Sequence, residues 1–465
     1  MKRKTVDMLH GPVWKALLAF SVPIVLTNWL HMFFNAADSM IAGRWGGEGA
    51  LASVGATFVF VMLNIAFFGG LATGVTVCAA NDWGAGDREG YDKTAHTAVL
   101  LAFLTGLFVL ALAEVLARPV MTAMHVPADI IGGAVLYLRI YMLCMPAQMV
   151  YNSSASLMRA RGDSHSPLVF LMIAGASNVV LNMIFVIAFH WGVVGVAAAT
   201  VMTQYLSAFL ALRTLFRRDS IYGMHFSRLR LDGAKTRRIL LIGIPAGLQA
   251  SMLAASDIPL QSSANSLGSQ AVAGNAAALS LEALAFTTME AVSQGATVFT
   301  GQCVGARDHQ RVRKVLWTGM AMTVALGAVV GWICLVFRYP LLRLYQPDSA
   351  EAVAWGAQRC MAVCSMAFIY GVLAAMNASL RGYRISTPQA IINGFGLFGF
   401  RLLWAKFYFP LHPDLFHLYL SYPVAWALCI IATACLYRPL IRRQTAKMRA
   451  AEIAEAGPDG ETGTP

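Results

Sequence analysis

The chain has 465 residues, of which 58% are hydrophobic and only 12% are charged, and its formal net charge is +12. Soluble domains carry about 25% charged residues, so this composition excludes a set of soluble domains and indicates one polytopic membrane protein. The basic residues lie in short stretches between apolar runs, which is the pattern that sets membrane topology, so we expect no nucleic-acid partner.

Apolar runs of roughly twenty residues, long enough to cross a bilayer as helices, recur twelve times along the chain. Their centres lie near Leu26, Met62, Phe108, Met142, Ile173, Ala199, Leu253, Phe286, Ala325, Met366, Phe398 and Ala427. We therefore predict an all-α membrane protein with twelve transmembrane helices. The longest polar break, 217–238, is interpreted as a cytoplasmic linker between an N-terminal lobe (1–216) and a C-terminal lobe (239–446). Residues 447–465 are polar and contain glycine and proline, so we expect a disordered tail.

The distribution of lysine and arginine predicts the orientation. Most of these residues lie at the N-terminus, in the loops after even-numbered spans, to which we assign Arg159 and Arg381, and in the tail. The loops after odd-numbered spans hold only Arg44, Arg118, Arg338 and Arg343. Because basic residues accumulate on the cytoplasmic side, both termini are expected to be cytoplasmic. Arg139 and Arg359 occupy equivalent places near the outer ends of spans 4 and 10, and we expect both to extend to the membrane interface.

The two halves of the sequence repeat each other at an offset of 220 to 222 residues. Pro23 corresponds to Pro245, and the glycine-rich stretch 84–87 corresponds to 305–308, which favours a turn over a phosphate-binding loop. Six spans per half is an even number, so the halves lie parallel in the membrane. Transporters built from such halves move them around a central site, whereas the alternative is a duplicated scaffold without a transport role.

The first half contains a candidate cation-coupling site. Asp38 lies in the first span, and a carboxylate at membrane depth normally faces a protein interior or a wet cavity. Asn178 and Asn182 in span 5 share one helix face because they are four residues apart. With Thr200 of span 6 they would form one polar pocket around Asp38. The alternative is that the amides and the hydroxyl only hold helices together.

The second half contains its own ionisable groups, namely Asp257 in span 7, Glu282 and Glu290 in span 8, and Arg401 in span 11. Glu282 and Glu290 share a helix face roughly two turns apart. We expect a cationic substrate between the lobes to meet these carboxylates, with Arg401 neutralising one of them. The alternative for Arg401 is a purely structural ion pair.

Catalytic and nucleotide-binding motifs are absent from the sequence. It contains no nucleophile–base motif, no metalloprotease motif and no Walker phosphate loop. We therefore expect no enzymatic activity, no cofactor and no metal centre, and any uphill transport is expected to use an ion gradient.

Over about residues 9–448 the chain resembles the multidrug and toxic compound extrusion (MATE) family. The resemblance rests on motifs in both halves, which are Asp38 with Gly43 and Arg44, the paired turns, Asn178 with Asn182, the small-residue run ending at Thr200, the stretch 243–249, Glu282, Gly301 with Gln302, Arg401 with Trp404, and Pro423 with Trp426. It implies two six-helix lobes around a central cleft, and export of drug-like cations in exchange for protons or sodium. We further expect a monomer surrounded by lipids in the inner membrane of a bacterium.

In family members with a cation site in the first lobe, the coupling residues match Asp38, Asn178, Asn182 and Thr200. The position of Asn182 is commonly aspartate in such proteins, so the single remaining carboxylate favours a proton over sodium. Asp257 stands where related sequences often carry a neutral residue, so the second lobe is a further candidate for coupling. The nearest alternative is a lipid-linked oligosaccharide flippase of the same superfamily, which usually lines its cleft with several basic residues. The intramembrane carboxylates favour export of cations instead.

Overall fold

The computed structural model describes residues 5–45, 50–217 and 223–456, and this part of the chain contains helices and turns but no strand. Eight helices are long and apolar enough to cross a membrane, and two bent helix pairs would each cross as one span. Together with α10 (Ser269–Gly305) and the helical stretch 386–408, they occupy the positions of the twelve predicted spans. The prediction of an all-α membrane fold is thus confirmed.

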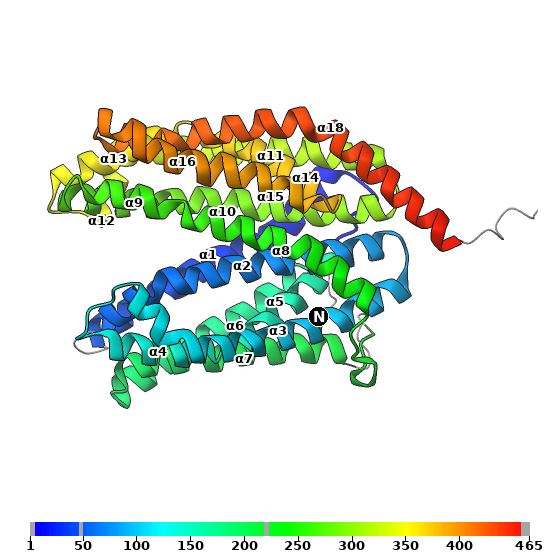
Figure 1. Cartoon of the computed structure of the whole chain (residues 1–465), viewed down its shortest axis with the longest axis horizontal. Helices are drawn as coiled ribbons and strands as arrows, with labels where there is room; N and C mark the ends of the chain where they lie inside the picture. Colours follow the sequence, from blue (N-terminus) through cyan, green and yellow to red (C-terminus); the bar gives the residue numbers. More distant parts are fainter. Residues whose placement is uncertain (1–4, 46–49, 218–222, 457–465) are drawn as a thin grey trace, which may run out of the picture.

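The helices form two bundles that lie side by side (Figure 1). The first bundle comprises α1 (Val13–Trp45), α2 (Ala50–Gly84), α3 (Arg88–Ala123), α4 (Ile131–Met142), α5 (Met145–Ala160), α6 (His165–Asn182) and α7 (Gly192–Phe216). Helices α4 and α5 meet at an angle of 43°, and a π-helical stretch, Met183–Ala188, follows α6. The bundle therefore runs from α1 to α7.

The second bundle begins with α8 (Gly233–Ala255), α9 (Asp257–Asn265) and α10 and ends with α18 (Ser421–Ala456). Between them lie α11 (His309–Val336), α12 (Arg338–Tyr345), α13 (Ala350–Cys364), α14 (Ala367–Gly382), α15 (Ser386–Asn393), α16 (Phe400–Leu403) and α17 (Leu415–Tyr419). Helix α8 starts inside the predicted linker. Helix α18 continues through the first part of the predicted tail, so that part is helical rather than disordered; residues 457–465 lie outside the described chain.

The internal repeat is visible in the turns that join α2 to α3 and α10 to α11. Asp87 accepts a hydrogen bond from the backbone amide of Gly90 over 2.7 Å, and Asp308 accepts one from the amide of Arg311 over 2.8 Å. Each aspartate therefore caps the N-terminus of the following helix. The residue before it has a left-handed backbone in both turns, with φ of 73° at Gly86 and 58° at Arg307. These contacts confirm that the glycine-rich stretches are turns.

The two bundles meet along α2 and α8, where glycines allow the backbones to approach closely. A Cβ atom at Gly70 would collide with the backbone of Gly247. Asp232, at the start of α8, accepts a hydrogen bond from the amide of Lys235 over 2.8 Å, which holds the pKa of that carboxyl below its usual value. Asp232 therefore caps the N-terminus of α8, the helix that packs against α2 where the two bundles meet.

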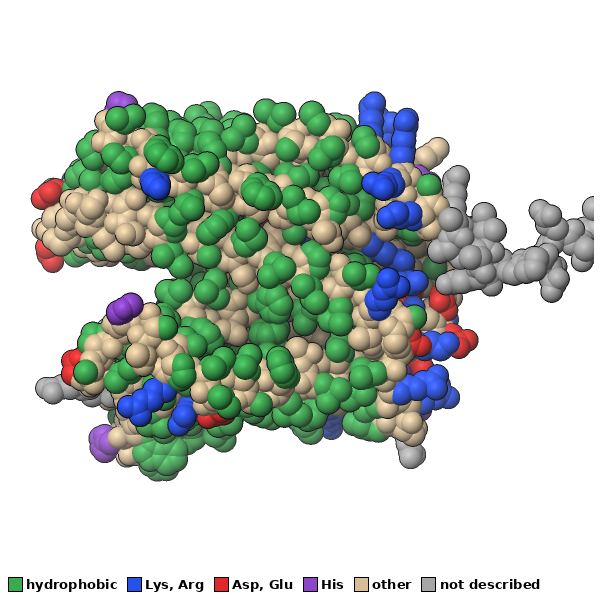
Figure 2. All heavy atoms as spheres, in the orientation of Figure 1, with side chains coloured by type: hydrophobic (Ala, Val, Ile, Leu, Met, Phe, Trp, Pro, Cys, Tyr) green, Lys and Arg blue, Asp and Glu red, His purple; other side chains and the backbone are tan. Residues whose placement is uncertain are grey.

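At one end of the molecule the bundles are also joined by side-chain amides from equivalent positions of the repeat. Asn81 Nδ2 donates to the carbonyl of Gly382 over 3.3 Å, and Gln302 Nε2 donates to the carbonyl of Ala160 over 2.7 Å. Lysines and arginines gather at this same end, whereas the molecule is hollowed between the bundles at the opposite end (Figure 2). The lobes are therefore closed at the basic end and separated at the other.

Candidate functional site

A cavity of about 530 Å³ lies between the two lobes. Its walls come from α2 and α5 of the first lobe and from α8, α9, α10 and α14 of the second, and its charged lining residues are Arg159, Asp257, Glu290 and Arg381. Two of the carboxylates expected from the sequence thus lie in one cleft. Arg159 and Arg381, which the sequence placed in basic loops, lie in the cleft as well.

Glu290 of α10 is positioned by two residues of α14. The Tyr370 hydroxyl donates to Glu290 Oε2 over 3.2 Å, and Arg381 Nη2 lies 3.7 Å from Glu290 Oε1. Arg381 Nη2 also donates to Ser293 over 2.9 Å, which holds the guanidinium beside α10. The Glu290 side chain keeps 35% of its surface exposed, so it remains accessible to a molecule in the cleft.

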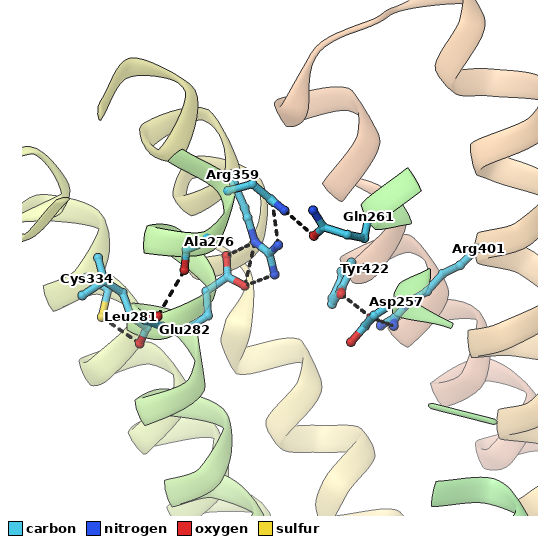
Figure 3. Close-up of polar contacts among 11 residues, drawn as sticks. Asp257, Gln261, Ala276, Leu281, Glu282, Cys334, Arg359, Arg401 and Tyr422 are labelled. Atoms are coloured by element: carbon cyan, nitrogen blue, oxygen red, sulfur yellow. Dashed lines mark hydrogen bonds and ion pairs between the residues drawn. The ribbon is translucent and has the colours of Figure 1, made fainter. Parts of the chain in front are cut away.

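Asp257 lies in a cluster with Arg401 and Tyr422 (Figure 3). The Tyr422 hydroxyl donates to Asp257 Oδ1 over 2.7 Å, and Arg401 Nη1 lies 3.4 Å from the same oxygen. The Arg401 guanidinium is buried, lies over the Tyr422 ring at 3.7 Å and donates to Ser256 over 2.9 Å. Arg401 therefore pairs with one acidic residue, as both interpretations of the sequence required. That residue is Asp257, whose side chain is 55% exposed.

Glu282 lies away from the cleft, in a separate buried ion pair with Arg359 (Figure 3). Arg359 Nη2 and Nε both donate to its carboxylate, at 2.8 and 3.1 Å, and both side chains are at most 3% exposed. Arg359 Nη1 also donates to Asn275 over 2.7 Å. Two expectations are corrected by this geometry. Glu282 does not face a substrate between the lobes, and Arg359 does not extend to the membrane interface.

Asp38 forms a hydrogen-bonded chain with the two asparagines of α6. Asn182 Nδ2 lies 2.6 Å from Asp38 Oδ1 and 3.1 Å from Asn178 Oδ1, and Asn178 Nδ2 donates to Thr203 Oγ1 over 3.4 Å. The chain therefore connects α1, α6 and α7. A cavity of about 90 Å³ is lined by Asp38, Asn178, Thr200 and Thr203. Three of the four predicted residues thus line one polar pocket, and the fourth, Asn182, is hydrogen-bonded to two of them.

Thr200 lines the pocket, but its hydroxyl donates to the carbonyl of Val196 over 3.1 Å. The side chain that continues the chain from Asn178 is Thr203, one helical turn further along α7. Asn182 Oδ1 is buried and has no hydrogen-bond partner among the described residues. The π-helical stretch after Asn182 marks a local change of helix pitch, a feature often found at functional sites.

Sequence reasoning missed several residues of both sites. Thr203 was not predicted, although it follows Thr200 by three residues and therefore lies on the same face of α7. Tyr370 and Tyr422 carry no motif of their own, and only their contacts with Glu290 and Asp257 identify them. His31 lines the pocket of Asp38 and was also not singled out. The signal in the sequence that identifies Thr203 is its spacing, because it is a polar residue one helical turn from Thr200.

Comparison with known proteins gives a consistent result. A family model described as MatE matches residues 23–185 and 245–405, one stretch in each lobe. The probable multidrug resistance protein YpnP of Bacillus subtilis (strain 168) is 29% identical over 401 residues, which cover 84% of this chain and 87% of that protein. The multidrug resistance protein PmpM of Pseudomonas aeruginosa is 25% identical over 395 residues, covering 83% of this chain and 82% of that protein.

Solved structures show the same fold. An outward-facing conformation of a multidrug resistance MATE family transporter aligns with a TM-score of 0.85 at 21% identity, over 95% of this chain and 98% of that one. A transporter of the MOP superfamily from Pyrococcus furiosus, described as having a binding pocket of reverse polarity, aligns with a TM-score of 0.87 at 20% identity. That alignment covers 95% of this chain and 99% of the other.

Proposed function

We propose that this chain, which belongs to the MATE family of transporters, is a secondary active multidrug efflux antiporter that exports lipophilic cations in exchange for protons. It is an integral multi-pass membrane protein and, like its family, a transporter rather than an enzyme. The observation that carries the proposal is Asp38, held by Asn182 beside a polar cavity in one lobe, next to a cleft with two accessible carboxylates. In this proposal Asp38 exchanges a proton, and the carboxylates in the cleft bind the cationic substrate.

The orientation proposed from the loop charges determines which side of the membrane the hollow between the lobes faces. If the basic end faces the cytoplasm, both termini are cytoplasmic and the hollow between the lobes opens outward (Figure 2). The amide contacts of Asn81 and Gln302 then close the cytoplasmic end. In alternating access these contacts break as the lobes move and the outer end closes.

The coupling step proposed here acts through the Asp38–Asn182 hydrogen bond. The ionised carboxylate accepts a strong, charge-assisted bond from the amide. When a proton from outside binds Asp38, the charge is lost and the bond weakens, so α1 and α6 are free to adopt a second arrangement. Release of the proton to the cytoplasm restores the first arrangement.

The proton is favoured over sodium because Asp38, Asn178, Asn182 and Thr203 bring only one formal negative charge to the pocket. A sodium ion gives up water on binding and needs several oxygen ligands, preferably with more than one carboxylate among them. A proton needs a single carboxylate. The proposed coupling group is therefore Asp38 with its amide partners.

The substrate class is proposed from Glu290 and Asp257. Both carboxylates line the cleft, and Tyr370 lies beside Glu290. Aromatic faces and carboxylates together attract lipophilic cations. Because Arg401 already neutralises Asp257 in part, Glu290 is the principal candidate for direct contact with the substrate. We propose that the protein works as a monomer surrounded by lipid.

A second function, flipping of an anionic lipid-linked oligosaccharide, is favoured by a different observation. Arg159 and Arg381 line the same cleft as the two carboxylates. A pyrophosphate group would pair with two guanidinium groups. The cleft thus carries both positive and negative charges. The sign of the charge on the transported group distinguishes the two functions.

The test of the proposed function is growth of a bacterium that lacks its own efflux pumps, with and without expression of this chain. Expression is expected to raise the minimal inhibitory concentration of several lipophilic cations, while Asp38→Asn at equal membrane abundance does not. No change in cation susceptibility, together with restored growth of a strain deficient in lipid-linked oligosaccharide flipping, would contradict cation export and support the second function.

A further inference from the structure

A groove of about 590 Å³ runs along the first half of α8 on the outside of the molecule. Most of its lining residues belong to α8, while Leu231 precedes that helix and Thr387 of α15 contributes the other wall. None of these residues lines the cleft between the lobes or the pocket of Asp38. The groove is therefore a separate feature that the proposed antiport does not use.

The groove is polar at one end and apolar at the other. Arg237, Leu241 and Ile244 are spaced by four and three residues, so they lie on one face of α8. Arg237 is exposed, and Leu241 and Ile244 keep 59% and 41% of their surface exposed. Arg237 lies toward the closed, basic end of the molecule, because Lys235 pairs there with Asp82 at the end of α2 over 2.6 Å. The polarity of the groove therefore follows the polarity of a membrane leaflet.

The length of the groove also matches one leaflet. Pro245, at its inner end, follows Arg237 by eight residues, which corresponds to about 12 Å of helix. The hydrocarbon region of one leaflet is about 15 Å deep, half of the roughly 30 Å of a bilayer. With Arg237 at the level of the headgroups, the apolar part of the groove therefore lies at the depth of the acyl chains.

Arg237 is available to an anion. None of the described residues forms an ion pair or a hydrogen bond with its side chain. The acid nearest to it in the sequence, Asp232, accepts a hydrogen bond from the amide of Lys235 over 2.8 Å instead and does not line the groove. A guanidinium group binds phosphate oxygens through paired hydrogen bonds. The charge at the polar end of the groove thus complements a phosphate group.

We propose that this groove binds one molecule of an anionic phospholipid from the leaflet at the basic end. Its phosphate pairs with Arg237, and an acyl chain lies against Leu241 and Ile244. A free anion leaves the apolar part unfilled, and a lipophilic cation meets Arg237 with the wrong charge. Because α8 packs against α2 where the two lobes meet, the bound lipid contacts a helix at the junction between the lobes.

The experiment measures thermal unfolding of the purified full-length chain in detergent micelles at constant ionic strength. The probes are dioleoyl phosphatidylglycerol, dioleoyl phosphatidylcholine and glycerol phosphate, which has the anionic group without acyl chains. A ligand that binds the folded state raises the unfolding midpoint in a saturable way. We expect this response at the lowest concentrations with phosphatidylglycerol and no response to glycerol phosphate. An equal response to phosphatidylcholine, or a response to glycerol phosphate, would overturn the proposal.

Two variants locate the site. Arg237→Gln removes the charge and is expected to bind phosphatidylglycerol about tenfold more weakly, as for loss of one charged hydrogen bond. Leu241→Trp keeps the charge but fills the groove, and it should weaken binding as well. Both positions are exposed, so the midpoints without lipid should stay close to that of the wild type. The matched controls, Arg313→Gln and Val329→Trp, change exposed residues of α11 and should respond like the wild type.

The variants also separate this site from other occupants. A loss in Arg237→Gln without a loss in Leu241→Trp would show attraction to a charged surface only, and an equal loss in Arg313→Gln would do the same; either result contradicts a lipid in the groove. Tighter binding of tetraphenylphosphonium by Arg237→Gln than by the wild type would assign the groove to the exported cation instead. The readout does not involve transport, so its failure leaves the proposed antiport untouched.

Discussion

Asn182 Nδ2 and Asp38 Oδ1 lie 2.6 Å apart, although the two residues are separated by 144 positions in the sequence. The bond joins α1, which also packs against α10 of the second lobe, to α6 inside the first lobe. A change in the charge of Asp38 therefore acts on a helix that touches both lobes. This relationship is the physical basis of the coupling proposed above.

Asp38→Asn is predicted to abolish coupled export while the protein remains folded. The asparagine oxygen can still accept the hydrogen bond from Asn182, but the side chain can no longer gain or lose a proton. Membrane abundance and the unfolding midpoint should be close to those of the wild type, with efflux reduced to background. If the variant retains full export at equal abundance, Asp38 has a structural role only.

Thr203→Val is predicted to impair coupling more than Thr200→Val. The Thr203 hydroxyl accepts the hydrogen bond from Asn178, whereas the Thr200 hydroxyl donates to its own helix backbone. Valine has nearly the same shape as threonine, so the first change leaves a buried amide donor without its partner, at a cost of about 1–3 kcal/mol. Efflux rates of the two variants in the same vesicles check this. Equal losses would show that the chain does not extend to Thr203.

Glu282→Gln is predicted to destabilise the protein rather than to change its substrate preference. Removing one partner of a buried ion pair leaves the other charge uncompensated, which costs about 3–5 kcal/mol. The unfolding midpoint should fall, and the double variant Glu282→Gln with Arg359→Met should recover much of the loss. If the variant has normal stability but loses export of cations alone, the prediction is wrong and Glu282 has a role in binding the substrate.

Glu290→Gln is predicted to weaken export of monovalent lipophilic cations more than export of neutral compounds. The carboxylate is partly exposed in the cleft, and Arg381 is 3.7 Å away, so the change removes negative charge without leaving a fully buried cation. Concentration dependence of efflux for one cation and one neutral substrate of similar size measures the effect. Equal losses for the two substrates would indicate a positioning role for Glu290 within α10.

The sequence predicted the spans, the repeat and most of the pocket of Asp38 for clear physical reasons. A bilayer requires long apolar helices, and four-residue spacing places Asn178 and Asn182 on one face. The partners of buried charges were not predictable in this way. Arg359 looked like an interfacial residue because its position along span 10 is all that the sequence gives, and its pairing with Glu282 depends on how α10 packs against α13.

The sequence also did not predict which basic residues at the ends of the spans lie in loops and which line the cleft. Arg159 and Arg381 were counted as loop residues because they lie at the ends of apolar runs. In the structure, α5 and α14 continue to Ala160 and Gly382, so both side chains point from helices into the cleft. A difference of a few residues in two helix ends therefore adds two positive charges to the cleft that Asp257 and Glu290 line.

The measurement that tests the central claim most directly is efflux of a fluorescent lipophilic cation from proteoliposomes with a pH gradient or a sodium gradient imposed separately. The account predicts transport driven by the pH gradient alone, with no response to sodium when pH is clamped. Asn182→Asp, which adds a second carboxylate beside Asp38, should gain a sodium response. Efflux of the wild type driven by sodium alone at constant pH would contradict proton coupling through Asp38.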